Sequence, residues 1–428
     1  MNLVASWKAQ GWTPWAPQAI FRASNSREAS RFQVIEEDQN DIPYNQYLAT
    51  ELLRFSTIEE LRESEFYRAH ESELTRLLSE PRVYRASNPK PRLNSFLRVV
   101  EWNIERGARL EGIVNVLNSH PVLRYADVLL LNEVDCGMRR SGNVNVALEL
   151  SRALSAHAIF GVEYLELTKG NEDECQLDGE NTAALHGNAI LTRHDFFAPR
   201  VLRLPRCENN FESSERRLGG RIGILVELEI AGKRLSVGNT HLDVVNTPRC
   251  RGKQMRAFLD AMEAQNKRKL AIVGGDLNTH TFARGTRLRA MKNTTTILTS
   301  RRSSLHKRLA NPETREPAIR EFVRFGYEPS EFNDRSATSR SIVSKLDDPR
   351  GLPRPMKWWV NRRIGPDGLL LEFRLDWLAA RGFGALRANE RVDDGSSVAS
   401  VDAHTVRNLT HNGHPLSDHD PIVVDLAI

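Results

Sequence analysis

The chain has 428 residues, of which 40% are hydrophobic and 27% are charged, and its formal net charge is +5 at pH 7. This is enough material for one large domain with an appendage, or for two domains. No stretch approaches the ~18 uninterrupted apolar residues of a transmembrane helix, so we expect no membrane span.

The N-terminal residues lack the basic region and the sustained apolar core of a secretory signal peptide. The four cysteines lie far apart, without a Cys-x-x-Cys pair or a histidine at zinc-ligand spacing. These features favour a cytoplasmic protein with free thiols, although they also permit two disulfides. The cysteines are Cys136, Cys175, Cys207 and Cys250.

Residues 1–94 are predicted to form an N-terminal extension of helical and irregular structure that carries no recognisable chemistry. The charge-rich stretch 57–80 has apolar residues at helical spacing and ends at a proline, which predicts one helix. The proline-containing stretch 82–94 predicts a linker. We expect the extension to serve packing or regulation, with an irregular first part that carries Trp7, Trp12 and Trp15.

Two apolar stretches that end in polar side chains follow the extension. Residues 97–107 predict a strand that runs into Asn103 and Glu105 and is closed by a glycine. Residues 127–135 predict a second buried strand, which carries Glu133 near its end. A buried carboxylate is seldom left unpaired, so Glu133 requires a cation unless it faces solvent.

The middle of the chain predicts further secondary structure around one histidine. Residues 223–230 and 233–239 predict a hairpin that turns at Ala231-Gly232, and His241 follows its second arm. At such a strand end both a functional and a structural histidine are possible. The acidic stretch 171–180 predicts a mobile surface loop. Helices are expected at 110–118, 144–157 and 249–263, and a short strand at 186–192.

The stretch Lys269-Leu-Ala-Ile-Val-Gly-Gly-Asp-Leu-Asn278 combines a strand with a polar end. Residues 270–273 are apolar and partly β-branched, as expected of a strand that is covered on both faces. Asp276 and Asn278 follow two glycines, and catalytic groups of α/β proteins often lie just past such strand ends. Gly, Asp and Asn also form ordinary turns, so the motif gains weight only because the same arrangement recurs along the chain.

A basic insertion is predicted at about residues 281–368. Between Thr281 and Gly365 there are 19 Lys and Arg against 8 Asp and Glu, which gives this segment +11 and leaves −6 for the rest. The excess indicates either an anionic partner or a solvated Arg-rich surface without a ligand. Trp358 and Trp359 lie among basic residues, as in surfaces that bind nucleic acid by charge and stacking, although such aromatic residues are more often core.

Polar residues also mark the strands predicted after the insertion, at 369–380 and near the C-terminus. Oxygen donors without a cysteine cluster favour a hard cation such as Mg²⁺ or Mn²⁺. Histidines and carboxylates add acid and base groups, and the combination suits phosphoester hydrolysis, which needs charge neutralisation, an activated water and a protonated leaving group. The whole set comprises Asn103, Glu105, Glu133, His241, Asp276, Asn278, Asp376, Asp418 and His419.

The order of these blocks resembles the endonuclease/exonuclease/phosphatase superfamily, and the resemblance covers about residues 96–428. It implies a catalytic domain at 95–428 with an α/β fold: a four-layer α/β sandwich in which two mixed β-sheets pack face to face, helices lie outside and the site lies at one rim. The blocks that carry it are Trp-Asn103, Asn-Glu133, Asn-Thr-His241, Gly-Asp276-Leu-Asn278, Arg-Leu-Asp376-Trp and Ser-Asp418-His419.

The resemblance also implies which residues hold the metal. Glu133 would be the principal ligand of a Mg²⁺ or Mn²⁺ ion. Asn103 and Glu105 come from the block that supports the metal site and the phosphate contacts in this superfamily. Asp418 would lie near the metal. These four residues form the expected metal site.

The remaining blocks would supply the catalytic residues. Asp276 and Asn278 would position or deprotonate the attacking water and hold the phosphate. Asp376 would hydrogen-bond His419, which would contact the phosphate or act as acid or base. His241 occupies the position where DNase-like members keep a second histidine, which argues against abasic-site repair.

The sequence departs from the family pattern at two places; the first should leave the Glu133 carboxylate in place, and the second argues against inositol polyphosphates as substrates. Asn132 replaces the commoner glutamine before Glu133, and the Trp-Cys-Asp-Arg block of the inositol polyphosphate 5-phosphatases is absent after Asp376. The expected partner is an anionic phosphoester, with nucleic acid first because of the basic insertion. The alternatives are a phospholipid phosphodiesterase, a phosphomonoesterase and a non-catalytic scaffold of the same fold. A scaffold would be expected to lack some functional residues, and none is missing.

Overall fold

The computed structural model describes residues 41–207, 209–265, 270–342 and 369–428, together with residues 355, 358, 359 and 362. The chain divides into two compact units, Met1–Val34 and Ile35–Ile428, and every described residue belongs to the second. The N-terminal tryptophans Trp7, Trp12 and Trp15 lie outside the described residues.

The larger of the two main sheets, sheet A, has eight strands among the described residues. Strands β2 and β3 are parallel and the other described neighbours are antiparallel, so the sheet is mixed. The spatial order is β1 (Arg82–Tyr84), β4 (His157–Glu166), β5 (Leu185–Thr192), β3 (Val128–Cys136), β2 (Leu97–Arg106), β19 (Ile422–Leu426) and β16 (His404–Thr405), with β7 (Arg217–Gly219) beside β4.

The second sheet, sheet B, has five strands among the described residues and is also mixed, because β9 and β10 are parallel. The predicted hairpin is confirmed as β8 and β9, which pair in register up to Ile230 and Lys233. Ala231 and Gly232 both have positive φ (50° and 72°), as a two-residue hairpin turn requires. The spatial order is β13 (Asp376–Arg381), β10 (Ala271–Asp276), β9 (Lys233–Thr240), β8 (Ile222–Ile230) and β6 (Phe196–Arg203).

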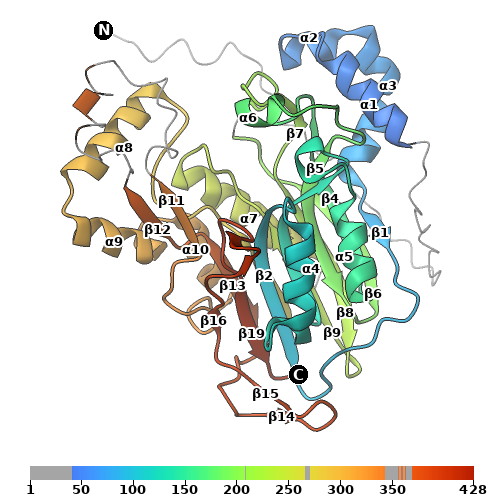
Figure 1. Ribbon diagram of the computed structural model, residues 1–428, viewed down its shortest axis with the longest axis vertical. Helices are drawn as coiled ribbons and strands as arrows, with labels where there is room; N and C mark the ends of the chain where they lie inside the picture. The colour runs from blue at the N-terminus through green and yellow to red at the C-terminus, as the bar shows by residue number, and fades with distance from the viewer. Residues whose placement is uncertain are drawn as a thin grey trace. The chain divides into compact units, whose positions relative to one another are not determined.

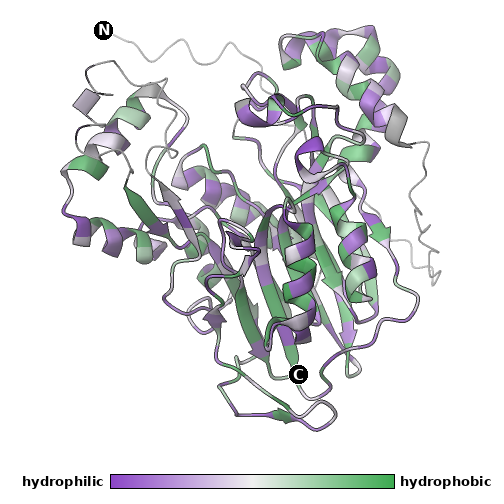
Figure 2. Ribbon diagram, viewed as in Figure 1, coloured by the Kyte–Doolittle hydropathy of each residue, from purple (hydrophilic) through white to green (hydrophobic). Residues whose placement is uncertain are grey.

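The two sheets pack face to face through a buried apolar layer. Val99 and Leu130 of sheet A belong to one hydrophobic cluster with Val237 and Ile272 of sheet B. The outer face of each sheet has its own apolar cluster, which it shares with helices. The ribbon shows the strands between these helices, and hydrophobic residues are concentrated on the strands (Figures 1 and 2). The predicted four-layer α/β sandwich is confirmed.

The predicted helices are present and pack on the outer faces of the sheets. Helices α4 and α5 contact each other, and α5 also contacts strands of sheet A, whereas α7 packs against α10 and β9 on the sheet B side. Asn145 caps α5, because its side chain accepts a hydrogen bond from the N–H of Leu148. The helices are α4 (Leu110–Ser119), α5 (Val146–Leu154), α7 (Pro248–Gln265) and α10 (Pro317–Arg324), with short 3₁₀ turns η1 (Leu123–Tyr125) and η2 (Arg139–Ser141).

The N-terminal region differs from the prediction in two respects. The expected single helix at 57–80 is two helices, because Ser64 adopts an extended conformation and its side chain caps the second. The expected linker begins instead with β1, which pairs with β4. Apolar residues of the three helices join the cluster on the outer face of sheet A. These helices are α1 (Asp41–Leu52), α2 (Ile58–Glu63) and α3 (Glu65–Ser79).

The insertion between β10 and β13 folds partly into separate helices and partly onto the main body. Helix α10 packs on α7, whereas the preceding helices form a small apolar cluster with the β-ribbon of β11 and β12. Ile297, Leu305 and Leu309 of the helices contribute to this cluster, and Leu371 and Phe373 contribute from the ribbon. The elements are α8 (Arg287–Thr299), α9 (Arg302–Ala310), η3 (Pro312–Thr314), β11 (Ser339–Ile342) and β12 (Leu370–Phe373).

Two further segments differ from the sequence-based expectation. The stretch predicted as one strand at 369–380 is two strands in different sheets, because the chain leaves the β11–β12 ribbon after Phe373 and enters sheet B at Asp376. The acidic stretch 171–180 was predicted as a loop, but Asn171 starts a one-turn helix with a capping box. This helix is α6 (Glu172–Cys175), and the remaining ribbons are β14 (Val392–Asp393) with β15 (Val398–Ala399) and β17 (Thr410–His411) with β18 (His414–Pro415).

The expectation of four free thiols is wrong for two of the cysteines. Cys207 and Cys250 form a disulfide across a sequence separation of 43 residues, and Cys136 and Cys175 are not part of it. The bond ties the segment after β6 to the first turn of α7, a pairing that the sequence spacing does not reveal. As expected from the hydropathy of the sequence, no helix in the described part of the chain is long and apolar enough to cross a bilayer.

Candidate active site

Polar strand ends from both sheets meet at one rim of the sandwich. On sheet A, β2 and β3 run parallel, and their ends carry Asn103 and Glu133. On sheet B, Asp276 at the end of β10 pairs with Asp376 at the start of the antiparallel strand β13. His241 follows β9, which is parallel to β10, so it reaches the same end of the sheet as Asp276.

Asn103 connects the two sheets at this rim. Its Nδ2 donates to Glu133 Oε1 and to Asp276 Oδ2, both at 3.2 Å, and its Oδ1 accepts from the N–H of Glu105 at 3.1 Å. Glu105 and Glu133 have φ of 47° and 53°, a conformation that residues other than glycine seldom adopt. Such backbone strain is concentrated at functional sites, where the surrounding structure holds it in place.

Glu133 lies in a strongly cationic environment. Arg106 Nε lies 4.0 Å from Glu133 Oε2. Burial acts to raise the pKa of Glu133, but Arg106, His241, His186 and the Asn103 amide outweigh it and hold the pKa well below the ordinary glutamate value. Glu133 is therefore ionised at neutral pH. This is the state that a metal ligand requires.

Asp376 and His419 form a hydrogen-bonded pair beside Asp276. His419 Nδ1 lies 2.7 Å from Asp376 Oδ2, and its Nε2 lies 3.9 Å from Asp276 Oδ2. Burial acts to lower the pKa of His419, but Asp376, Asp418 and Asp276 raise it well above the ordinary histidine value. The imidazole is thus protonated near neutral pH and can neutralise negative charge or donate a proton.

Thr338 holds Asp376 in place, and no motif in the sequence indicated this residue. Its Oγ1 donates to Asp376 Oδ2 at 2.5 Å and accepts from the N–H groups of Leu375 and Asp376 at 3.1 Å. Ser339, the next residue, forms an isolated β-bridge with His419. Thr338 and Ser339, at the start of β11, therefore orient both members of the Asp376–His419 pair.

Asp276 and Asn278 lie on a tight loop directly after β10. Asp276 Oδ1 accepts from the N–H of Asn278 at 2.8 Å, and Asn278 has a φ of 49°. Asn278 Nδ2 donates to the carbonyl of Leu242 at 2.9 Å, so one amide hydrogen holds the neighbouring loop and the other stays available. The two residues are held close together, as the motif predicted.

Several buried carboxyl groups lie close to Asp276. Burial and the neighbouring Asp376 raise the pKa of Asp276 to about 7. Glu101 of β2 is fully buried, and neither of its carboxyl oxygens has a hydrogen-bond partner among the residues that the structure describes. Burial, Asp376 and Asp276 raise the pKa of Glu101 well above the ordinary value. Sequence analysis missed Glu101, because it lies inside an apolar strand without any motif.

His241 is joined to a buried arginine rather than to a carboxylate. His241 Nδ1 lies 2.9 Å from Arg221 Nη1, and His241 Nε2 lies 3.4 Å from Asp276 Oδ2. Arg221 also pairs with Glu163 at 2.8 Å and with Asp243 at 3.5 Å. Burial and Arg221 lower the pKa of His241 well below the ordinary value, so it is neutral where His419 is protonated. Arg221 carried no sequence signal.

Asn132, which the sequence marked only as a departure from the family pattern, connects several strands. Its Oδ1 accepts from the N–H of Asp276 at 2.7 Å, and its Nδ2 donates to Asn188 Oδ1 at 3.0 Å and to Asn239 Oδ1 at 3.1 Å. Asn188 in turn donates to Glu163 Oε1 at 2.9 Å. A fully satisfied buried polar network of this kind fixes the relative positions of the strands that it joins.

A second ionic cluster, also missed by the sequence, lies next to Glu133. Asp135 of β3 pairs with Arg140 at 2.9 Å and with His186 at 2.7 Å. Glu174 of α6 forms an ion pair with Arg106, the arginine beside Glu133, and lies 3.7 Å from Arg140. The acidic segment around α6 is therefore held against the rim by arginines.

Comparison with known proteins identifies the family. A sequence model described as the Endonuclease/Exonuclease/phosphatase family matches residues 100–419, which is most of the chain. The chain belongs to this family. The predicted resemblance is thereby confirmed, and Asn103, Glu133, His241, Asp276, Asp376 and His419 lie within the matched residues or at their boundary.

Solved structures of several family members are similar to this chain. A protein of the family from Beutenbergia cavernae is 17% identical, covers 78% of this chain and 72% of its own, and has a TM-score of 0.45. TDP2 from D. rerio, complexed with a single-strand DNA product, is 15% identical with coverages of 78% and 99% and a TM-score of 0.41. The human Nocturnin catalytic domain is 16% identical, with coverages of 82% and 97% and a TM-score of 0.41. No curated protein matches the chain.

The donor groups of the rim fit the divalent cation that this family of phosphoesterases uses. Asp276, Asp376 and His419 each offer a ligand atom, and these atoms lie within 4.8 Å of one another. The predicted ligands Glu105 and Asp418 are less enclosed: the Glu105 side chain is 38% exposed and pairs with Arg109, and Asp418 is exposed. The excess of acidic groups around Asp276, which include Asp376 and Glu101, is what a hard cation would neutralise.

The described contacts do not bring the predicted tryptophans to the rim. Trp358 is 61% exposed, and Arg362 lies 5.3 Å from its ring centroid. Trp359 is partly exposed. No described interaction connects either ring with Glu133, Asp276 or His419.

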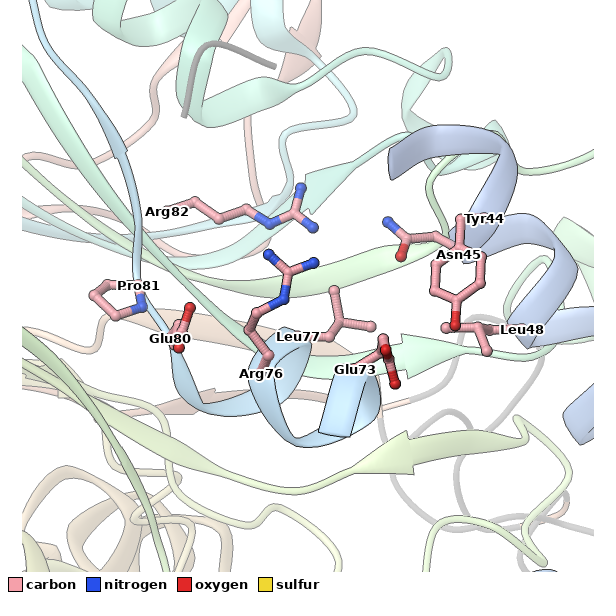
Figure 3. Close-up of a pocket in the computed structure, with 9 residues that line it drawn as sticks. All are labelled: Tyr44, Asn45, Leu48, Glu73, Arg76, Leu77, Glu80, Pro81 and Arg82. Carbon is pink, nitrogen blue, oxygen red and sulfur yellow. The ribbon is translucent and has the colours of Figure 1, made fainter. Parts of the chain in front are cut away.

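A small pocket lies elsewhere, between α1, α3 and β1. Figure 3 shows its lining, in which the guanidinium groups of Arg76 and Arg82 lie near each other and Asn45 faces them from α1. None of the nine lining residues belongs to the predicted site. The candidate active site is therefore the polar rim of the two sheets and not this pocket.

Proposed function

We propose that this protein hydrolyses phosphodiesters in a reaction that depends on a divalent metal, Mg²⁺ or Mn²⁺. The observation that carries the proposal is the placement of Asn103, which bridges Glu133 and Asp276, while Asp276 also approaches His419. One rim therefore holds three complementary groups. They are the ionised carboxylate of Glu133, which can bind a cation, the carboxylate of Asp276, whose pKa is raised, and the protonated imidazole of His419. This combination suits phosphoryl transfer.

Glu133 is the principal candidate for holding the metal, with Asn103, Glu105 and Asp418 as further candidates around it. When bound, the ion supplies charge neutralisation at the phosphoryl oxygens and polarises the phosphorus–oxygen bond. The support is the lowered pKa of Glu133, which leaves it ionised at neutral pH, and the strained backbone that holds it. Asn103 would keep the Glu133 carboxylate oriented, because its amide donates to it directly.

Asp276 and Asn278 would handle the attacking water. Asp276 is the acceptor for the proton of the water, since its pKa of about 7 makes it a base that can accept a proton near neutral pH. The N–H of Asn278 fixes one Asp276 oxygen, which leaves the other directed toward Asn103 and the two histidines. The free amide hydrogen of Asn278 can donate to a phosphate oxygen.

The two histidines would have different tasks because their protonation differs. His419, held protonated by Asp376, would stabilise the negative charge of the phosphorane-like transition state or protonate the leaving oxygen. His241, held neutral by burial and by Arg221, would contact the phosphate as a hydrogen-bond donor. Asp376 serves as the partner that orients His419.

Nucleic acid is the first candidate for the substrate, because the insertion beside the rim is strongly basic. A phospholipid head group is the second, since a cationic surface also suits anionic lipids, and a phosphomonoester is the third. The three substrate classes can be ranked by measuring turnover in the presence of Mg²⁺. The substrates to compare are single- and double-stranded oligonucleotides, sphingomyelin vesicles and p-nitrophenyl phosphate. If the lipid is hydrolysed preferentially, nucleic acid is not the substrate, but the proposal that the protein hydrolyses phosphodiesters stands.

Glu133→Gln tests the metal-dependent mechanism itself. We expect this variant to lose hydrolysis of bis(p-nitrophenyl) phosphate by at least a thousandfold and to lose the increase in melting temperature that Mg²⁺ or Mn²⁺ gives to the unmodified protein. Glu149→Gln, on α5, whose side chain is 43% exposed and pairs with Arg152, is the matched control that should change neither. A non-catalytic scaffold would show no hydrolysis in any variant, and undiminished hydrolysis in EDTA would refute the metal.

A further inference from the structure

The helices of the insertion carry an unusually one-sided charge. Residues 284–315, which we call the α8–α9 lobe, contain nine Lys and Arg and one acidic residue, Glu313. Five of the cations are exposed, and none of these five forms an ion pair within the described part of the chain. They are Lys292, Arg301, Arg302, Lys307 and Arg315.

The absence of acidic neighbours distinguishes the lobe from an ordinary solvated surface. Just beyond it, Arg340 and Arg407 both pair with Glu372 and Asp420, so that the charges alternate in sign. Soluble surfaces normally interleave both signs in this way, because a large field of one sign repels itself. An unbalanced field on an exposed surface is therefore best explained by an anionic partner.

The lobe is attached to the loop that leads away from the candidate active site. Arg308 of α9 donates to the hydroxyl of Thr281 at 2.7 Å and to its carbonyl at 2.8 Å, and Thr281 belongs to the loop that follows Asp276. A long anion bound at the rim can therefore extend onto the lobe.

The dimensions of the lobe fit a polymer rather than a single phosphate. Helix α9, which carries Arg302 and Lys307, has 9 residues and is about 14 Å long, and phosphates along one nucleic-acid strand are spaced by about 3.4 Å along the axis. This helix alone thus spans about four nucleotides. Membrane binding needs an apolar face beside the cations, but the large apolar side chain that α8 exposes is Leu288 alone among its described residues.

We propose that the α8–α9 lobe is an exosite that binds the sugar–phosphate chain of a nucleic acid several nucleotides away from the phosphodiester that is cleaved. The inference rests on the proposed function, because it assigns the substrate class of the same site. It predicts that binding depends on the length of the strand. The lobe contributes to the affinity for the substrate and not to the chemistry at the rim.

The test compares two triple variants that remove the same charge. Arg301→Gln/Arg302→Gln/Lys307→Gln alters the lobe. Its matched control, Arg68→Gln/Lys90→Gln/Lys233→Gln, removes three exposed cations elsewhere, including the first residue of β9, whose opposite end leads to His241. Melting temperatures of both should match that of the parent, since exposed residues are exchanged.

Binding is measured by fluorescence anisotropy with labelled single strands of 4, 8, 12 and 20 nucleotides, in EDTA and in a Glu133→Gln background that prevents cleavage. We expect the lobe variant to bind the 20-mer at least tenfold more weakly and to lose the gain in affinity between 4 and 12 nucleotides. The slope of log K against log salt should fall by about 2, because about 0.7 ions are released per phosphate contact on single strands. The control should keep both properties.

Equal affinity of the lobe variant and the control for the 20-mer would overturn the exosite. So would binding of the lobe to vesicles of phosphatidylserine in preference to oligonucleotides. Hydrolysis of bis(p-nitrophenyl) phosphate by the unmodified protein tests the proposed function separately. If that hydrolysis is absent while the lobe variant still loses oligonucleotide binding, the catalytic proposal fails and the exosite stands.

Discussion

Asn132 Oδ1 accepts a hydrogen bond of 2.7 Å from the backbone N–H of Asp276, and this contact joins the two sheets at the candidate active site. Asn132 directly precedes Glu133, so one buried side chain fixes the strand end of the proposed metal ligand relative to that of the proposed base. Asn188 and Asn239 hold its amide group in turn. The distance between the two carboxylates thus depends on a residue that touches neither of them.

Asn132→Ala should reduce both stability and turnover. It leaves the buried N–H of Asp276 and the oxygens of Asn188 and Asn239 without a partner and creates a cavity, which together cost about 2–4 kcal/mol of the free energy of unfolding. Turnover of a small diester should fall at least tenfold, because the end of β10 is no longer fixed. Urea unfolding and steady-state kinetics measure the two effects. Asn118→Ala, at an exposed position, should change neither, and a stable, fully active Asn132→Ala would show that the contact is dispensable.

The pKa of Asp276 predicts a dependence of stability on pH. Burial and Asp376 raise the pKa of Asp276 to about 7, above the value of about 3.9 expected in the unfolded chain. The folded protein therefore holds this proton more tightly, and the free energy of unfolding should fall as pH rises from about 4 to about 7. The difference between the two pKa values corresponds to at most about 4 kcal/mol.

Asp276→Asn should remove this dependence. In EDTA, the variant and the parent should have similar stability at pH 4, and the variant should be the more stable of the two at pH 8, while its turnover is lost. Urea unfolding between pH 4 and pH 8 measures the difference. A difference in stability that stays constant over this range would show that Asp276 does not titrate as its surroundings indicate.

The sequence revealed the site residues that terminate strands but not the residues that hold them. Asp276 and Glu133 follow apolar runs, so a strand with a polar end was visible in each case. Asn132 and Thr338 act through contacts between segments more than 35 residues apart, and local pattern contains no information about such contacts. Glu101 was hidden for the opposite reason, because it lies in the middle of a strand where an apolar residue is expected.

Many of the strands could be predicted from the sequence, but some of their boundaries could not. Apolar and alternating runs, which depend on local sequence, predicted β2, β3, β5, β10 and the hairpin of β8 and β9, but they did not predict β4 or β6. The division of 369–380 into β12 and β13 depends on which sheet each half joins, and that is decided by tertiary packing. Ser64 likewise ends α2 and caps α3 within a stretch whose apolar spacing is continuous.

Thr338→Val should lower turnover by acting through Asp376. Valine has nearly the same shape but leaves the N–H groups of Leu375 and Asp376 unpaired and removes the hydrogen bond to the Asp376 carboxylate. We expect kcat to fall about tenfold or more and the free energy of unfolding to fall by about 1–3 kcal/mol. Thr338→Ser keeps the hydroxyl and should retain most of the turnover.

A double-mutant cycle separates this positioning role from a general loss of structure. If Thr338 acts only by orienting Asp376, then Thr338→Val should have little further effect on kcat in an Asp376→Asn background. Its effect on stability should persist there, because the unpaired N–H groups remain. Additive effects on kcat would show that Thr338 reaches the reaction by a different route.

The disulfide between Cys207 and Cys250 should make the stability of the protein sensitive to reduction. The bond closes a loop across a sequence separation of 43 residues, and the loss of unfolded-state entropy for a loop of this length corresponds to about 4 kcal/mol. The double variant Cys207→Ser/Cys250→Ser should therefore unfold at a lower temperature than the parent, and dithiothreitol should lower the melting temperature of the parent but not that of the variant. Cys175→Ser, which alters a free thiol, should behave as the parent does in both conditions. If the melting temperature of the parent is the same with and without dithiothreitol, the disulfide contributes nothing to stability. The segment after β6 would then be held on α7 by other contacts, such as the hydrogen bond from Gln254 to the carbonyl of Pro205.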